Sequence, residues 1–212
     1  MMMEDEDVSD EVAALLRNDG ITVLTSSMPV RVEPADGGRL RLTVRMEDGE
    51  RQFEDSHLLS AIGRIPNTEA LTIEAAGVRL EDHGFIEVDE YLETSVPGVY
   101  TMGDVNWRPG LHHLSYDDYR ILYANLIRHE ELSTRDRIVP YTVFIDPQLG
   151  SAGMTEREAK AEGRAIRVVK LPMSAVIRAI EAGETCSFRR PSSTRIAGIF
   201  WAAKSLAAKA AR

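Results

Sequence analysis

The stretch VPGVYTMGDVN, residues 96–106, carries a β-branched and apolar run directly into a carboxylate, Asp104. The run from Val99 to Met102 predicts a buried strand, and only Gly103 separates it from the acid. Buried strands of α/β proteins present their carboxyl ends to the ligand crevice. The sequence therefore predicts that Asp104 contacts a ligand. The alternative is that Asp104 caps the next helix.

Composition limits the classes of partner. The chain has 212 residues, 43% hydrophobic content and a net charge of −9, which is typical of a globular protein. This charge argues against nucleic acid or an anionic membrane surface as a partner. The N-terminus MMMEDEDVSD is acidic, unlike a secretory signal, and no apolar run has the length of a membrane span. We therefore expect a cytoplasmic protein with no membrane or nucleic-acid partner.

The first sixty residues predict a helix and a small sheet. A helix over 6–20 is expected, with Asp5 or Ser9 as its cap. Alternating apolar and polar residues then predict three antiparallel strands, joined by turns at 35–38 and 47–50. The stretch SHLLSAIG, residues 56–63, is expected to form a short buried strand.

The remaining elements are expected to alternate between helix and strand. A long helix is predicted over 110–131, with Tyr116, Asp117, Asp118 and Tyr119 on its surface. Strand, turn and strand follow over 137–154, and a further strand is expected over 166–174. Between them Thr155 and Glu158 form a capping box that starts another helix.

Three stretches together resemble the class I pyridine nucleotide-disulfide oxidoreductases, flavoproteins such as dihydrolipoamide dehydrogenase, glutathione reductase and mercuric reductase. They are LLSAIGRIPN (58–67), TSVPGVYTMGDV (94–105) and RIVPYTVFIDPQLGSAGMTEREAKAEG (137–163), and they occur in family order. Within the family, KLPMSAVIRAIEAGET (170–185) is most similar to mercuric reductase and its relatives of unassigned substrate.

The resemblance implies an α/β and α+β fold: partial FAD- and NAD(P)-binding Rossmann-like domains, then the first part of an α+β dimerisation domain. Residues 1–57 would be the C-terminal part of the NAD(P)-binding domain. Residues 58–132 would be the second FAD-binding segment, or central domain, and residues 133–185 a truncated dimerisation domain.

The resemblance also implies the site residues. Gly103 and Asp104 would bind FAD, with the acid accepting a hydrogen bond from a ribityl hydroxyl, and Gly63 would clear space beside the cofactor. Leu111 and His112 would lie against the isoalloxazine ring, where the N-terminus of a helix stabilises negative charge on reduced flavin.

Metal and catalytic residues are not expected. His112 and His113 are adjacent, so on a helix their side chains point in different directions, and no third ligand is evident. The family's catalytic His lies in a His-Pro…Glu segment, and neither His83 nor His129 lies in such a motif.

The implied activity is electron transfer from NAD(P)H through FAD to a disulfide or a metal ion, in a homodimer. The 212 residues contain no GxGxxG loop, and a single cysteine, Cys186, excludes the C-x4-C redox pair of the family. We therefore expect a fragment, resembling the second half of a family chain, that is inactive by itself. The alternative is a binding module that associates with a separately encoded N-terminal half.

Residues 186–212 differ in composition from the rest of the chain, because they contain no Asp or Glu. In a shifted reading frame, each codon consists of the third base of one present codon and the first two bases of the next. In that frame the codons of Phe200-Trp201 encode Leu, those of Trp201-Ala202 encode Gly, and those of Ile199-Phe200 can encode Ile. This restores the ILG that the family carries there. We hypothesise a tail translated out of frame, whose Ala- and Lys-rich end favours helix. A divergent but genuine tail is the alternative.

Overall fold

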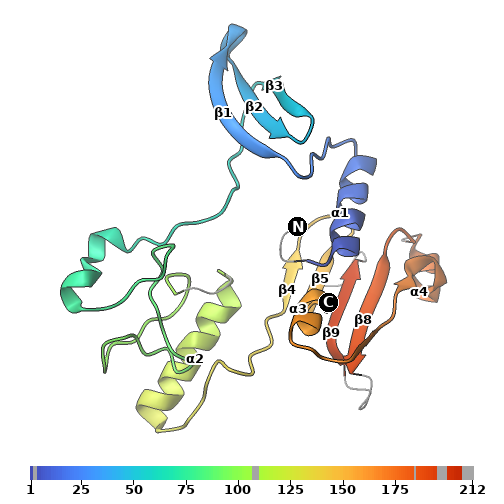
Figure 1. Ribbon diagram of the computed structural model, residues 1–212. Coiled ribbons are helices and arrows are strands. Elements are labelled where there is room, and N and C mark those ends of the chain that lie inside the picture. The colour runs from blue at the N-terminus through green and yellow to red at the C-terminus, as the bar shows by residue number, and fades with distance from the viewer. Residues whose placement is uncertain (2–3, 107–109, 184, 195–199, 207–212) are drawn as a thin grey trace. The chain divides into compact units, whose positions relative to one another are not determined.

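The computed structural model describes residues 1, 4–106, 110–183, 185–194 and 200–206 (Figure 1). The chain forms two compact units, residues 1–63 and residues 64–212. Each mixes helix and strand, which confirms the predicted α/β and α+β class.

The first unit begins with the predicted helix, α1 (Glu6–Asn18). Asp5 is its N-cap residue, whereas Ser9 lies inside the helix and its hydroxyl donates to the Asp5 carbonyl at 3.2 Å. Of the two candidates for the cap, the structure therefore selects Asp5 as the capping position.

The predicted antiparallel meander follows α1 and is confirmed. It consists of β1 (Met28–Ala35), the 3-10 turn η1 (Asp36–Gly38), β2 (Arg39–Met46) and β3 (Gly49–Asp55). Ion pairs cross from β2 to β3, including one of 2.7 Å between Arg41 Nη2 and Glu54 Oε1. Such exposed cross-strand pairs help fix the register but add little stability.

The strand predicted over 56–63 is absent from the structure, and this prediction is wrong. The backbone there has no regular structure, and Leu59 and Ile62 are 89% and 87% exposed. A strand persists only where its amides and carbonyls find a partner. No strand in the described part of the chain pairs with this segment.

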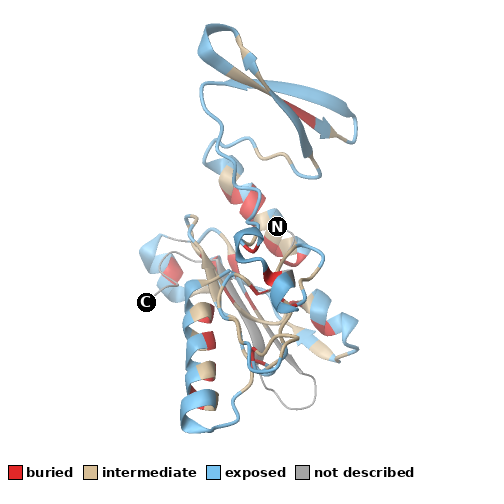
Figure 2. Ribbon diagram, turned by 90° about the vertical axis from the view of Figure 1, so that its left-hand side faces the viewer, coloured by how far each residue is buried: buried red, intermediate tan, exposed pale blue. Residues whose placement is uncertain are grey.

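The first part of the second unit, residues 64–128, consists of short turns and single β-bridges followed by a long helix. The turns are η2 (Glu69–Leu71) and η3 (Ile73–Ala76), and the helix is α2 (His112–Arg128), within the predicted range. Ile73, Val78 and Ile86 form a small buried cluster between the bridges. Figure 2 shows buried residues along one side of α2.

A six-stranded antiparallel sheet completes the second unit, with the order β4-β5-β9-β8-β6 and β7 beside β8. Its elements are β4 (Tyr141–Val143), β5 (Leu149–Gly153), α3 (Glu156–Ala161), β6 (Ile166–Val168), β7 (Leu171–Pro172), η4 (Met173–Ala175), α4 (Ile177–Ala182), β8 (Phe188–Thr194) and β9 (Phe200–Leu206).

The capping box that starts α3 is confirmed, since Thr155 Oγ1 accepts from the Glu158 amide at 3.1 Å and the Glu158 carboxylate accepts from the Thr155 amide at 2.7 Å. The strand predicted over 166–174 is divided into β6 and β7 and ends in η4.

The helical preference expected of the Ala- and Lys-rich end is not realised over residues 200–206. This stretch is β9, which pairs with β5 on one side and β8 on the other. Intrinsic propensity is weak compared with two ladders of backbone hydrogen bonds, so tertiary context decides the structure here. The last six residues lie outside the described part of the chain.

Candidate functional site

Asp104 lies in an irregular turn rather than at the tip of a buried strand. Residues 99–106 make isolated bridges, Glu93 with Tyr100 and Ile86 with Asn106, and Met102 is 50% exposed. The predicted buried strand is therefore wrong, because the segment finds single bridging partners and not a continuous neighbouring strand.

Asp104 does not cap the following helix, because the N-cap residue of α2 is Leu111. Instead Arg64 Nη1 donates to Asp104 Oδ2 at 2.6 Å, and the Asp104 side chain stays 47% exposed. The Arg64 side chain is 70% exposed. At one surface the pair therefore presents the Asp104 carboxylate as a hydrogen-bond acceptor and the N–H groups of Arg64 as donors.

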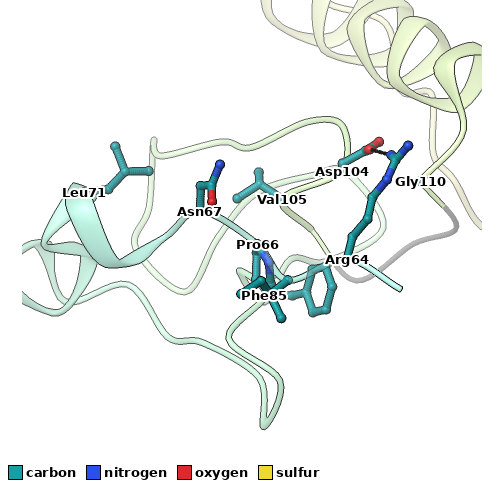
Figure 3. Close-up of a pocket in the computed structure, with 9 residues that line it drawn as sticks. Arg64, Pro66, Asn67, Leu71, Phe85, Asp104, Val105 and Gly110 are labelled. Carbon is teal, nitrogen blue, oxygen red and sulfur yellow. Dashed lines mark hydrogen bonds and ion pairs between the residues drawn. The ribbon is translucent and has the colours of Figure 1, made fainter. Parts of the chain in front are cut away.

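A cavity of about 710 Å³ opens beside this ion pair. Figure 3 shows Arg64 and Asp104 facing each other, with Gly110 next to them. The lining consists of Arg64, Ile65, Pro66, Asn67, Leu71, Phe85, Asp104, Val105 and Gly110. Most of these side chains are apolar, so the charged pair and the Asn67 amide supply the polar contacts.

Gly110 keeps the cavity open at the carboxylate. A Cβ atom at this position would lie 3.0 Å from Asp104 Oδ2 and 3.1 Å from Asp104 Cγ. Any other residue would push the carboxylate aside or fill the space next to it. The backbone at residue 110 can therefore approach the acid closely only because the side chain is missing.

A second cavity of about 730 Å³ begins one residue further along the chain. Its lining comes from the N-terminus of α2 and from the β4–β5 hairpin: Leu111, His112, His113, Pro140, Tyr141, Thr142, Phe144, Gly150, Ser151 and Ala152. The first amides of a helix lack intrahelical acceptors and carry partial positive charge. The two linings adjoin at Gly110 and Leu111.

Gly103 and Asp118 connect the Asp104 turn to α2. Asp118 was expected on the helix surface, but it is only 1% exposed, so this prediction is wrong. Its Oδ2 accepts from the Gly103 amide at 2.9 Å, and its Oδ1 accepts from Arg137 Nη2 at 2.6 Å. The buried carboxylate is stable because it is both hydrogen-bonded and paired with a cation.

The predicted site residues lie in four places. Asp104 lines the first cavity, and Leu111 and His112 line the second. Gly103 lies behind Asp104, against Ser115 of α2. Gly63 ends the first unit, immediately before Arg64.

The sequence reasoning missed Arg64 and Gly110. Their signals were present, since Arg64 directly follows Gly63 in the quoted GRIPN and Gly110 directly precedes Leu111.

Two kinds of feature are absent from the described residues. No group of three His, Cys, Asp or Glu side chains in that part of the chain is placed to hold a metal ion. Likewise, none of the described helices combines the length and hydrophobicity needed to cross a membrane.

Two family models match the sequence. The model for pyridine nucleotide-disulphide oxidoreductases matches residues 1–118, and the model for the dimerisation domain of these enzymes matches residues 139–191. The chain belongs to this family. The resemblance inferred from the three motifs is thereby confirmed.

Curated relatives of the oxidoreductase family share about a third of their aligned residues with the chain. The probable pyridine nucleotide-disulfide oxidoreductase RclA of Escherichia coli K12 is 36% identical over 183 residues, 86% of this chain and 40% of the relative. Dihydrolipoyl dehydrogenase of Mycobacterium tuberculosis is 33% identical over 187 residues, which cover 87% of this chain and 40% of the relative. The chain spans about 40% of the length of these relatives.

Solved family structures agree with the fold. The HOCl-induced flavoprotein disulfide reductase RclA of E. coli matches with a TM-score of 0.84 and 32% identity, covering 99% of this chain and 47% of that chain. LpdA of M. tuberculosis matches with a TM-score of 0.82 and 26% identity, covering 96% and 44%.

Proposed function

We propose that the chain supplies part of the FAD site of an oxidoreductase that transfers electrons from NAD(P)H through FAD to a disulfide or a metal ion. The observation that carries the proposal is the Arg64–Asp104 pair beside Gly110, at a cavity whose lining continues into the N-terminus of α2. An elongated ligand with a polyol and a ring suits two adjoining cavities.

The residues of the first cavity fit the polar middle of FAD. Asp104 offers an ionised acceptor to a ribityl hydroxyl, a charge-assisted and therefore strong hydrogen bond. Arg64 leaves most of its guanidinium exposed, which suits a phosphate. Gly110 admits the ligand next to the carboxylate because no Cβ stands there.

The residues of the second cavity fit the flavin ring. Leu111 supplies an apolar contact, and we assign His112 a backbone contact rather than imidazole chemistry. The first amides of α2 would favour negative charge on the ring. Bound FAD would supply the redox chemistry by accepting two electrons from a reduced nicotinamide and passing them to the acceptor.

The final electron acceptor is proposed from the relatives. Two of them are described as a dihydrolipoyl dehydrogenase and a disulfide reductase, and another solved structure as the Cu(II) complex of RclA. A disulfide is our first candidate. A metal ion is the second, favoured by the likeness of residues 170–185 to mercuric reductase.

We further propose that this chain is cytoplasmic and inactive by itself, and that the activity and the homodimer belong to the parent family protein of which it is a fragment. The 212 residues contain no GxGxxG loop and one cysteine, whereas the chemistry needs a dinucleotide loop and a redox dithiol. The match of residues 139–191 to the dimerisation domain supports the homodimer.

The alternative proposal is a half-protein that binds a separately encoded FAD- and NAD-binding half. The exposed apolar side chains of Leu59, Ile62 and Ile65 favour such a partner. Co-expression with the N-terminal half of a family relative tests this proposal. A stable complex that retains FAD supports it, and failure to co-purify contradicts it.

The proposed domains remain 1–57, 58–132 and 133–185, with an out-of-frame tail from about residue 186. DNA sequencing across codon 186 tests the tail. Codons that encode ILG in the shifted frame would support the proposal, and codons that forbid it would end the idea.

FAD titration tests the flavin site directly. We expect the chain to quench FAD fluorescence saturably, and Asp104→Ala to weaken binding at least about tenfold, because hydrogen bonds to charged groups are worth roughly 1.5–3 kcal/mol. The control is Asp136→Ala, which removes an exposed acid that lines neither cavity. Equal affinities for all three proteins would contradict the assignment of Asp104.

A further inference from the structure

Asp118 and Arg137 form a buried ion pair behind the proposed flavin site. Their side chains are 2% and 8% exposed, and Arg137 Nη2 donates to Asp118 Oδ1 at 2.6 Å. Arg137 also pairs with Asp117, Nε to Oδ2, at 3.0 Å. Both carboxylate oxygens of Asp118 accept hydrogen bonds, whereas Nε and Nη1 of Arg137 are buried without a hydrogen-bond partner, so the two contacts of Asp118 define its position.

The second oxygen of Asp118 defines the position of Gly103. Asp118 Oδ2 accepts from the Gly103 amide at 2.9 Å, and the Gly103 carbonyl accepts from the Asn106 amide at 3.2 Å. Gly103 has a φ of +82°, and a Cβ there would lie 3.3 Å from Ser115 Oγ. Gly103, the residue that precedes Asp104, is thus held by hydrogen bonds at its amide and at its carbonyl, and its backbone lies close to Ser115.

We infer that Asp118 and Arg137 are positioning residues, which fix the Gly103 peptide and through it aim the Asp104 carboxylate at the first cavity. Neither residue lines that cavity. The inference rests on the proposed function for its consequence, FAD affinity. The fixed geometry of the Gly103 peptide is a property of the free protein.

Hydrogen exchange measured residue by residue by NMR tests the geometry without any ligand. Asp118→Ala removes the acceptor, so exchange at the Gly103 amide should rise at least about tenfold more than exchange at amides in the middle of α2, whose rise reports the general loss of stability. The matched control is Asp117→Ala, which removes the neighbouring partner of Arg137 but no contact to Gly103. An unchanged Gly103 rate, or a rise at Gly103 no larger than the rise in the middle of α2, would overturn the inference.

Asp118→Asn replaces the alanine variant if the latter does not fold. The amide oxygen of the new side chain will turn toward the Arg137 cation, which leaves an NH2 group facing the Gly103 amide. Faster exchange at Gly103 is therefore expected here too, and a protected Gly103 would count against the inference.

FAD titrations of Asp104→Ala, Asp118→Ala and the double variant test the consequence. If Asp118 acts through Asp104, Asp118→Ala weakens binding about tenfold in the original chain and has no further effect once Asp104 is absent. Additive losses would mean that Asp118 acts independently and would overturn the inference. If the original chain binds no FAD, the proposed function fails, while the exchange experiment still decides the positioning role.

Discussion

Two family motifs behave differently in this chain. The segment 56–65 has no regular structure, and its apolar residues Leu59, Ile62 and Ile65 are 86–89% exposed. The turn at Gly103 and Asp104 is also irregular, yet Asp118 of α2, which is paired with Arg137, holds it in place. Both stretches carry a signature of the same family.

The contrast shows what orders a motif without regular secondary structure. The Gly103 turn finds its partners inside the chain, in Asp118, Arg137 and Ser115. Segment 56–65 has side chains that need cover, and the described residues do not provide it. A motif is ordered by the groups that satisfy its backbone and bury its side chains.

The largest expected effect comes from breaking the buried pair. Asp118→Ala or Arg137→Met should each lower the free energy of unfolding of the second unit by about 3–5 kcal/mol, because each leaves one buried charge unpaired. The double variant Asp118→Leu with Arg137→Met should recover part of this loss. Urea denaturation measures all three, and single variants within about 0.5 kcal/mol of the original chain would contradict the buried pair.

A leucine exchange compares the two regions directly. Leu92 is fully buried, and its carbonyl accepts from the Thr101 amide at 3.1 Å, just before the Gly103 turn. Leu92→Ala should cost about 2–5 kcal/mol of unfolding free energy. Leu59→Ala, in the exposed segment, should change it by less than about 0.5 kcal/mol. Similar losses at both positions would remove the distinction between the regions.

Gly110→Ala should affect binding more than folding. The new Cβ would lie 3.0 Å from Asp104 Oδ2, and the carboxylate must move to admit it. Overpacking of this kind costs typically about 1–3 kcal/mol, which we expect mainly as an FAD dissociation constant about tenfold higher. Isothermal titration measures it. Unchanged affinity would show that the space beside Asp104 is not used by the ligand.

The smallest effect concerns pH. The hydrogen bond and charge of Arg79, at 2.7 Å, hold the pKa of Glu87 below its ordinary value. A lowered pKa in the folded state contributes stability that is present above the unfolded-state pKa and is lost as the pH falls through the folded-state pKa. Arg79→Gln should therefore flatten the acid side of the stability profile slightly. Thermal melts between pH 6 and 3 measure it, and an identical profile would contradict the coupling.

Sequence patterns predicted the elements that depend on residues close together in the chain. The Thr155 and Glu158 capping box depends on a three-residue spacing, and the meander depends on its two turns. The split of 166–174 and the strand β9 depend on pairing with distant strands, so local propensity could not predict them. The strand predicted over 56–63 is absent for the opposite reason. Its sequence pattern suits a strand, but no strand among the described residues pairs with it.

The candidate site was predictable in its centre but not in its support. Asp104, Leu111 and His112, which the motifs singled out, line the cavities, and their contact with FAD stays a prediction. The contact of Arg64 with Asp104 joins residues 40 positions apart, and that of Arg137 with Asp118 joins residues 19 apart. Neither separation leaves a periodic signal, so Asp118 looked like a surface residue in a polar stretch of helix.

NMR mapping of FAD binding tests the central claim most directly. On addition of FAD, we predict shifts of the backbone amide signals of Asp104, Leu111 and His112, which line the two cavities, and of Gly103, which precedes Asp104. The amide signals of the meander, residues 28–55, should not shift. Shifts confined to the meander, or none at saturating FAD, would contradict the assignment of the flavin site.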